Sequence, residues 1–380
     1  MSNDTLPEIR FPGFTDDWEQ RKLGEIVQIT MGQSPNSENY TENPEDYILV
    51  QGNADMKNNR VVPRVWTTQI TKQAEKGDLI LSVRAPVGDI GKTDYDVVLG
   101  RGVAAIKGND FIFQQLGKMK ESGYWNRFST GSTFESINSN DIREALITIP
   151  TGEEQQKIGT FFKQLDDTIA LQQRKLDLLK ETKKGFLQKM FPKNGAKVPE
   201  IRFPGFTEDW EERRLQEVVD RYDNLRIPIT ASKRVAGNTP YYGANGIQGY
   251  VEGYTHDGEF ILVAEDGAND LKNYPVQYVD GKVWVNNHAH VIQAKENLAD
   301  NMFLMNAIRS INIEPFLVGG GRAKLNADVL MKLEVIIPLK SEQQKIGNFF
   351  KQLDDTIALQ QRKLDLLKET KKGFLQKMFV

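Results

Sequence analysis

Residues 154–191 read EQQKIGTFFKQLDDTIALQQRKLDLLKETKKGFLQKMF, and residues 342–379 repeat them with one change, Asn348 standing where the first copy has Thr160. In each copy apolar residues recur in steps of four and three over more than four heptads. This spacing predicts a long helix with a heptad seam. A helix that occurs twice predicts a chain built from two related halves.

Polar residues interrupt the seam at matching places: Gln172 and Lys183 in the first copy, Gln360 and Lys371 in the second. A buried polar residue there costs stability but can fix register and orientation. We expect the two helices to pair as a coiled coil, the alternative being that each packs alone on its own domain. The expected seam residues are Phe162, Leu165, Ile169, Gln172, Leu176, Leu179, Phe350, Leu353, Ile357, Gln360, Leu364 and Leu367.

Four apolar residues of the first copy, Phe161, Leu171, Leu178 and Leu187, lie off this seam. A simple two-stranded coil would leave them exposed. We therefore expect them to contact a further protein.

A second repeat precedes each helix. Residues 7–26 return at 199–218 with 15 of 20 positions identical, whereas the segments between the repeats differ. Matched scaffolds suggest two copies of one partner, and unlike segments suggest two different ligands. The expected divisions are a first variable domain with its repeat (1–152), a long helix (153–191), a linker (192–198), a second variable domain with its repeat (199–340) and a second long helix (341–380).

Composition indicates a globular protein: of its 380 residues, 27% are charged and 39% hydrophobic. No apolar run reaches the roughly 18 residues of a membrane span, and no signal peptide is visible. The chain has no cysteine, which fits a cytoplasmic location. With a net charge of −3, any contact with nucleic acid must be local or shared with a basic partner. A local basic excess does occur between Lys57 and Lys107.

The two variable domains share a pattern of short strands and glycine-rich turns, which predicts a mixed α/β fold. GDLILSVRAPVG (77–88) aligns with GEFILVAEDGAN (258–269), and YDVVLGRGVAAIKG (95–108) with DGKVWVNNHAHVIQA (280–294). Apolar strand positions keep their type, while the turns change. Arg84-Ala-Pro stands against Asp266-Gly-Ala, and Gly100-Arg-Gly against Asn286-Asn-His.

The changed turns suggest two kinds of side chain that could recognise nucleic-acid bases. Arg84 and Arg101 have the chemistry to read guanine edges. Amide side chains suit adenine edges, and the candidates are Asn245, Gln248, Asn269, Asn286 and Asn287. Ordinary turn chemistry explains any one of these residues equally well. Their collective difference between the two domains is harder to explain in that way.

We find no catalytic motif. Gly91-Lys92-Thr93 lacks the earlier glycine of a phosphate-binding loop, since that position is Pro86. His288 and His290 have metal-like spacing, but the chain has one further histidine and no cysteine, so hydrogen bonding explains them better than zinc. A GxSxG elbow and the Asn/Asp-Pro-Pro-Tyr segment of adenine methyltransferases are both absent from the sequence.

Taken together, these features resemble the specificity (S) subunit of type I restriction–modification systems over nearly the whole chain. The motifs that carry the resemblance are the segments 18–26 and 210–218, SVRAPVGDI, GRGVAAI, YGANGIQGY (242–250), DGAN (266–269), NNHAHVI (286–292), and the EEQQKI or SEQQKI that opens each helix. The near identity of the two helices departs from the looser similarity of related proteins.

The resemblance implies two α+β target recognition domains separated by an antiparallel coiled coil, with a pseudo-twofold internal repeat. Each domain would read one half of a bipartite, asymmetric site in double-stranded DNA. Two methylation subunits would carry S-adenosylmethionine and methylate adenine at N6, and restriction subunits would cleave DNA using ATP and Mg. The chain itself would bind no cofactor or metal and catalyse nothing. The candidate DNA-binding residues are Arg84, Arg101, Ser132, Thr133, Asn245, Gln248, Asn269, Asn287, His288, Arg322 and Lys324.

Two other classes of function stay open. An enzyme with a new site in the glycine-rich loops would show methyl transfer or ATP hydrolysis by the isolated chain. A structural adaptor with a coiled coil would show no sequence-specific DNA binding even when assembled.

Overall fold

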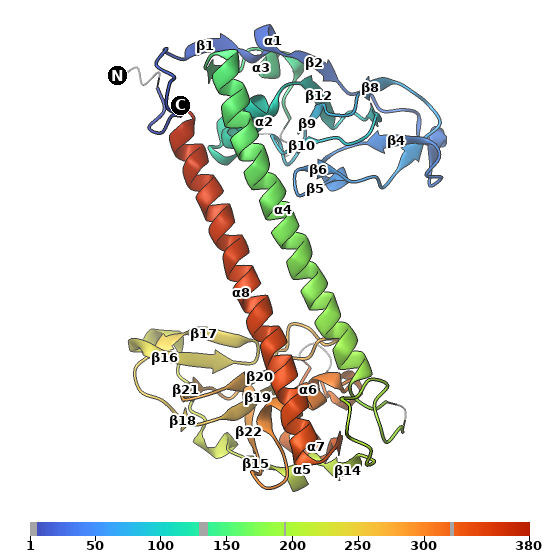
Figure 1. Ribbon diagram of the computed structural model, residues 1–380, viewed down its shortest axis with the longest axis vertical. Coiled ribbons are helices and arrows are strands. Elements are labelled where there is room, and N and C mark those ends of the chain that lie inside the picture. Colours follow the sequence, from blue (N-terminus) through green and yellow to red (C-terminus); the bar gives the residue numbers. More distant parts are fainter. Residues whose placement is uncertain (1–5, 129–135, 194, 320–322) are drawn as a thin grey trace. The chain divides into compact units, whose positions relative to one another are not determined.

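The computed structural model describes residues 6–128, 136–193, 195–319 and 323–380. It divides into two compact units: unit 1 comprises Met1–Arg174 and Arg362–Val380, and unit 2 comprises Lys175–Gln361. The mixed α/β class expected from the sequence is confirmed in both units (Figure 1). Within the described ranges, no helix combines the length and apolar character that crossing a membrane requires.

The duplicated sequence forms the two long helices α4 (Gly152–Lys189) and α8 (Lys340–Met378). Each begins in one unit and ends in the other. Helix α4 ends three residues before Pro192, which has no N–H to continue a helix.

Within each unit the two helices run antiparallel, as opposite charges in the seam show. In unit 1, Lys371 of α8 lies 2.7 Å from Asp166 of α4. In unit 2, Lys183 of α4 pairs with Asp354 of α8. A parallel alignment of two nearly identical helices would instead set Lys183 level with Lys371. The lysines that interrupt the seam therefore favour the antiparallel orientation.

All twelve residues expected in the coiled-coil seam are buried or half-buried. The off-seam expectation is wrong for two of its four residues. Phe161 packs edge-on against Phe374 in unit 1, and Leu187 packs on the core of unit 2. Phe161 is thus covered by α8 together with Phe11, and Leu187 by the core of its unit. Leu171 and Leu178 are 45% and 68% exposed.

Unit 1 contains two sheets beside a short ribbon. In sheet order, the first sheet consists of β2 (Gln28–Met31), β12 (Val103–Lys107), β9 (Leu79–Ser82), β10 (Ile90–Lys92), β6 (Arg60–Val61) and β5 (Met56–Lys57). The second consists of β3 (Tyr40–Thr41), β7 (Trp66–Thr67), β4 (Tyr47–Val50), β11 (Val97–Leu99) and β8 (Lys72–Ala74). The ribbon pairs β1 (Glu19–Lys22) with β13 (Leu146–Ile149), and the short helices are α1 (Leu23–Ile26), α2 (Asp110–Glu121) and α3 (Ser139–Arg143).

Unit 2 repeats this plan with fewer strands. Its first sheet consists of β15 (Val219–Arg221), β22 (Ala289–Ala294), β19 (Phe260–Ala264) and β20 (Val276–Val279). Its second consists of β17 (Gly246–Val251), β16 (Ala236–Gly243), β21 (Lys282–Val285) and β18 (His256–Asp257). The ribbon pairs β14 (Glu211–Arg214) with β23 (Glu334–Ile337), and the short helices are α5 (Leu215–Val218), α6 (Asn301–Ser310) and α7 (Ala327–Lys332).

Each core is completed by the end of the long helix that starts in the other half of the sequence. In unit 1, Phe379 stacks on Phe111, with ring centroids 5.0 Å apart, and Trp18 meets both rings edge-on. In unit 2, Phe191 plays the part of Phe379, packing on Trp210 and Phe303. The helix repeat supplies the same aromatic side chain to both cores.

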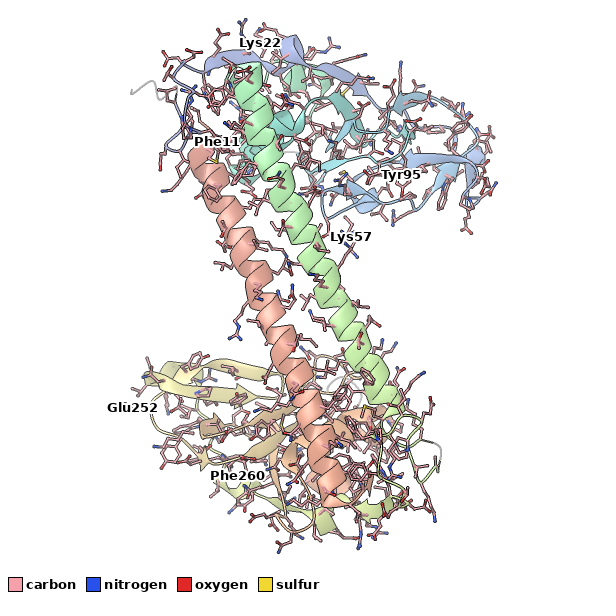
Figure 2. All side chains as sticks on the ribbon, in the orientation of Figure 1. Phe11, Lys22, Lys57, Tyr95, Glu252 and Phe260 are labelled. Atoms are coloured by element: carbon pink, nitrogen blue, oxygen red, sulfur yellow. The ribbon has the colours of Figure 1, made fainter. Side chains whose placement is uncertain are left out.

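The repeated N-terminal segments also bind the helices, and in unit 1 Phe11, which is labelled in Figure 2, packs on Phe161. The Ile9 N–H donates a 2.9 Å hydrogen bond to the carbonyl of Lys377 near the end of α8. Ile201 repeats this bond in unit 2, donating 2.9 Å to the carbonyl of Lys189. In each unit, the repeated N-terminal segment and the long helices therefore form a framework that carries the variable sheets.

Candidate functional site

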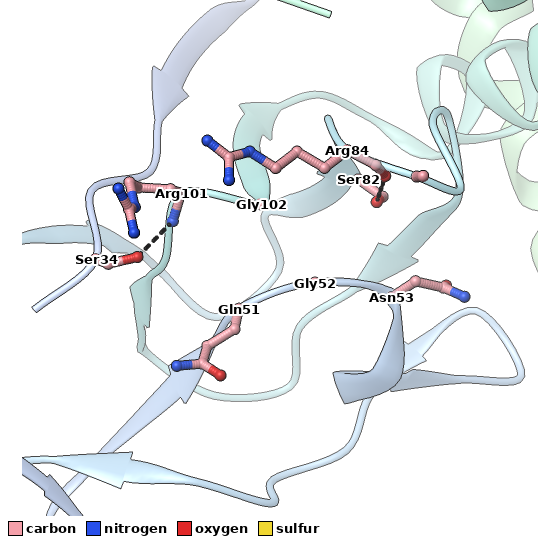
Figure 3. Close-up of a pocket in the computed structure, with 9 residues that line it drawn as sticks. Ser34, Gln51, Gly52, Asn53, Ser82, Arg84, Arg101 and Gly102 are labelled. Atoms are coloured by element: carbon pink, nitrogen blue, oxygen red, sulfur yellow. Dashed lines mark hydrogen bonds between the residues drawn. The ribbon is translucent and has the colours of Figure 1, made fainter. Parts of the chain in front are cut away.

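In unit 1, the chain segments that leave β4, β9 and β11 border an open cavity of about 220 Å³ (Figure 3). All three strands end at this place, so their following turns converge. The cavity is lined by Ser34, Gln51, Gly52, Asn53, Ser82, Arg84, Ala85, Arg101 and Gly102. Arg84 and Arg101, singled out separately from the sequence, therefore belong to one site.

Main-chain contacts fix the walls of this cavity. A Cβ atom on Gly102 would lie 2.1 Å from the carbonyl oxygen of Gln51, so only glycine fits there. The Arg101 N–H donates to the Ser34 hydroxyl at 3.1 Å, and the Ser82 hydroxyl donates to the carbonyl of Arg84 at 2.9 Å. The turns are thus held without using either guanidinium group.

Both guanidinium groups are available to a ligand. Arg84 and Arg101 are exposed, and no acidic side chain of the described residues pairs with either. The residues that line the cavity include no carboxylate. Two unneutralised cations beside a cavity produce a positive local potential in a chain whose net charge is −3.

Asp55 positions the wall opposite the arginines, a role that our sequence analysis missed. Its carboxylate is buried and accepts the N–H groups of Gln51 at 2.7 Å and Gly52 at 3.3 Å. The Arg64 guanidinium donates to its other oxygen at 2.9 Å. An aspartate three residues after a glycine is a recognisable turn signal, but the same signal is common in turns without function.

Backbone register identifies the equivalent place in unit 2. The Gly100 N–H donates to the Val50 carbonyl at 2.7 Å, as the Asn286 N–H does to the Tyr242 carbonyl at 3.1 Å. The isolated bridge between Arg84 and Ser136 likewise corresponds to the bridge between Asp266 and Lys324. Arg84 is therefore replaced by Asp266, Arg101 by Asn287 and Gly102 by His288.

Two of the candidate amides in unit 2 hold turns. Asn245 donates to the carbonyl of Gly267 at 2.8 Å and accepts the N–H of Asn269 at 2.9 Å. Asn286 is buried and accepts the N–H of His288 at 2.8 Å. Ordinary turn chemistry accounts for these two carboxamides.

Hydrogen bonds and ion pairs occupy the places in unit 2 that correspond to the arginine site. His288 Nδ1 is hydrogen-bonded to Asp266, at the position equivalent to Arg84. Lys324 lies 3.0 Å from Glu265, which also accepts from Arg226 at 2.7 Å. Burial alone would raise the pKa of Glu265, but the hydrogen bonds from Arg226 and Lys324 outweigh it and lower the pKa. Glu265 is thus ionised at neutral pH and compensates Lys324.

Behind this surface, His290 is buried and hydrogen-bonded to Asp223 at 2.8 Å and to the Leu325 carbonyl at 2.8 Å. Burial opposes the charge on Asp223, yet the hydrogen bonds from His290 and the Val291 N–H hold its pKa below the usual range. Among the described residues, no cluster of histidine, aspartate and glutamate has a metal-binding arrangement.

Three candidate amides of unit 2 remain accessible: Gln248, Asn269 and Asn287 are exposed. In the described ranges, none of their side chains is engaged in a hydrogen bond with the protein. Ser132, Thr133 and Arg322 lie outside the described residues. Unit 2 therefore presents amides and paired charges where unit 1 presents free arginines.

Comparisons with known proteins show which family the chain resembles. The sequence pattern of the type I restriction modification DNA specificity domain matches residues 15–181 and 207–369. A putative type I restriction enzyme specificity subunit of Haemophilus influenzae is 47% identical over 154 residues, covering 40% of this chain and 39% of that protein. A putative MjaX specificity subunit of Methanocaldococcus jannaschii is 32% identical over 177 residues, covering 44% of this chain and 41% of that protein. These matches thus span about two fifths of each relative's length.

Two comparisons extend over the whole chain. The type I restriction enzyme MjaIX specificity subunit of Methanocaldococcus jannaschii is 22% identical over 407 residues, covering 95% of this chain and 92% of that protein. The crystal structure of a type I restriction–modification S subunit from M. genitalium matches with a TM-score of 0.74 at 15% identity, covering 99% of both chains. The second likeness establishes the fold.

Proposed function

The chain belongs to the family of type I restriction–modification specificity subunits, and from this premise we propose that it reads a bipartite, asymmetric DNA target, with one half-site for each unit. One observation carries the proposal: equivalent turns on one framework present different polar groups in the two units. Unit 1 offers two free arginines, whereas unit 2 offers amides and paired charges. A protein that read two identical half-sites would have no use for this difference.

The repeated framework supports a second part of the proposal, that two copies of one methylation subunit bind the chain. Leu178 and its repeat Leu366 are both 68% exposed, and Leu171 and Leu359 are 45% and 48% exposed. Unpartnered leucines at matching places suit two copies of the same partner. In this scheme the partners supply S-adenosylmethionine for adenine N6 methylation, and restriction subunits supply ATP-dependent cleavage with Mg. The chain itself contributes no cofactor and no catalytic group.

The experiment is to produce the chain with its methylation subunit, determine their ratio by native mass spectrometry and map methylated adenines in the host genome. We expect one chain for two methylation subunits and a motif of two unlike halves separated by a spacer of fixed length. A 1:1 complex at saturating partner would contradict the two-copy scheme. Methylation without a bipartite motif would contradict the assignment of one half-site to each unit.

The free arginines predict a test within unit 1. Arg84→Ala or Arg101→Ala should relax one base position of one half-site, because a bidentate contact to guanine discriminates by about 1–3 kcal/mol. Methylation mapping and binding to a panel of single-base variants would measure the change. Arg60→Ala is the matched control, since Arg60 is an arginine of the same unit, with its side chain 41% exposed, that already pairs with Asp94 at 2.8 Å. Uniform weakening on all sequences would indicate a phosphate contact instead.

A further inference from the structure

At the end of one parallel strand pair, the two units carry different residues at equivalent positions. In unit 1, Val50 of β4 pairs with Leu99 of β11, so Gln51 and Gly100 follow side by side. In unit 2, Tyr242 of β16 pairs with Val285 of β21, followed by Gly243 and Asn286. The residue that follows the paired position of the first strand is thus Gln51 in unit 1 and Gly243 in unit 2.

In each unit a glycine lies next to a glutamine. A Cβ atom on Gly100 would lie 3.0 Å from the Cα of Gln51 and 3.4 Å from its Cγ. A Cβ atom on Gly243 would lie 2.2 Å from the Nε2 of Gln248 and 2.7 Å from its Cδ. The Gln248 carboxamide, which comes from the neighbouring strand β17, therefore fills the space where a side chain at position 243 would begin. Both units place a glutamine side chain at the same corner of the site, Gln51 from the turn after β4 and Gln248 from β17.

Neither carboxamide is used to hold the protein together. In the part of the chain that the structure describes, the Gln51 and Gln248 side chains make no hydrogen bond, in contrast to the turn-holding Asn245 and Asn286. Gln51 lines the cavity across from Arg84 and Arg101 (Figure 3).

The main chain behind each glutamine is nevertheless fixed. Asp55 accepts the N–H of Gln51 at 2.7 Å. In unit 2, Gln248 lies in β17 at a β-bulge, between the Tyr241–Gly249 and Tyr242–Ile247 pairs that join β17 to β16, and a bulge sets the direction of its side chain. A fixed backbone with an unused carboxamide is the arrangement expected of a residue kept for a ligand.

We propose that Gln51 and Gln248 are corresponding base-reading residues, and that each reads an adenine in the half-site of its own unit. A carboxamide end carries one acceptor and one donor group, which match the N6 amino group and N7 of adenine in the major groove. The inference rests on the proposed function, since it needs both units to face DNA. It adds to that function a base-reading residue in unit 1, Gln51. It also gives the two otherwise unlike sites one shared feature, a glutamine that reads adenine.

The test uses the complete complex with its methylation subunits and maps methylated motifs for single variants. Gln51→Ala should relax one A·T position in one half-site, with a roughly 5- to 150-fold loss of discrimination, and Gln248→Ala should do the same in the other half. Gln51→Glu should shift the preference at its position toward cytosine, because a carboxylate accepts from the cytosine N4 amino group. Gln73→Ala and Gln216→Ala are matched controls, both exposed glutamines outside the site.

The half-site that a variant does not touch reports that the complex is assembled and active, and hydrogen exchange of the altered unit reports on its folding. If Gln51→Ala loses the fold, Gln51→Met keeps the side-chain length and repeats the test. Relaxation at a G·C position, or weakening spread over all positions, would overturn the reading of adenine. An unchanged bipartite motif in every glutamine variant would overturn this inference alone, whereas a wild-type complex without a bipartite motif would overturn the proposed function as well.

Discussion

Replacing Glu154 with alanine should destabilise unit 1 by about 3 kcal/mol, because it leaves Arg10 beside the core without its partner. The Glu154 side chain is fully buried at the start of α4, and Arg10 is 14% exposed. The guanidinium donates to both carboxylate oxygens at 2.7 Å and also to the carbonyl of Asp16 at 2.6 Å. Breaking a buried pair costs about 3–5 kcal/mol, and the lower end applies because Arg10 keeps some contact with water.

The pseudo-twofold repeat supplies an internal control for this prediction. Arg202 and Glu342 form the same pair in unit 2, with Arg202 15% exposed and Glu342 fully buried. Hydrogen exchange followed by mass spectrometry measures each unit separately, because each peptide comes from one unit. A single unfolding curve of the whole chain would not separate the two units. Glu154→Ala should speed exchange in unit 1 and Glu342→Ala in unit 2. Glu19→Ala, which breaks an exposed pair with Arg21, should leave exchange unchanged. Equal effects of all three variants would show that burial does not decide the cost.

The sequence predicted the helices and strands well because their signals are local. A heptad seam and its repeat place α4 and α8 to within about two residues at each end. Strand-like runs such as 47–51 and 259–263 become β4 and β19. The sequence did not explain the lysines in the seam, because their partners lie on the other helix. Lys183 meets Asp354 only once the helices are antiparallel.

The candidate site depends even more on contacts between residues that are distant in the sequence. Residue type selected Arg84 and Arg101, but their convergence on one cavity depends on three separate strands ending together. Residue type cannot separate Asn245, whose carboxamide holds a turn, from Gln248, whose carboxamide is unused. The role of Gln51 was missed because it depends on Gly100, which follows the neighbouring strand β11, and on the comparison with Gly243 in unit 2. These residues are neighbours only in the folded chain, and a single sequence does not show which strands pair with one another.

Lengthening both long helices should lengthen the spacer of the DNA target while leaving the two half-sites unchanged. Helix α4 begins in unit 1 and ends in unit 2, and α8 does so in the opposite sense. Four helix-forming residues inserted after Lys180, and four after Lys368 at the equivalent place of the repeat, each add roughly 6 Å of helix. At about 3.4 Å per base pair this is one or two base pairs. The heptad seam can absorb four residues as a stutter, so both units should keep their own cores.

Methylation mapping would measure the spacer directly, after circular dichroism has confirmed that the variant keeps its helix content. An insertion into α4 alone is the matched control, because it makes the two helices unequal and should lower stability without giving a new defined spacer. Two half-sites that keep their sequence but move apart would identify the helix pair as the element that sets the spacing. A folded, active double-insertion variant that methylates the original spacing would show instead that the methylation subunits set it. In that case the helices would serve only to join the two units and to present the exposed leucines at matching places.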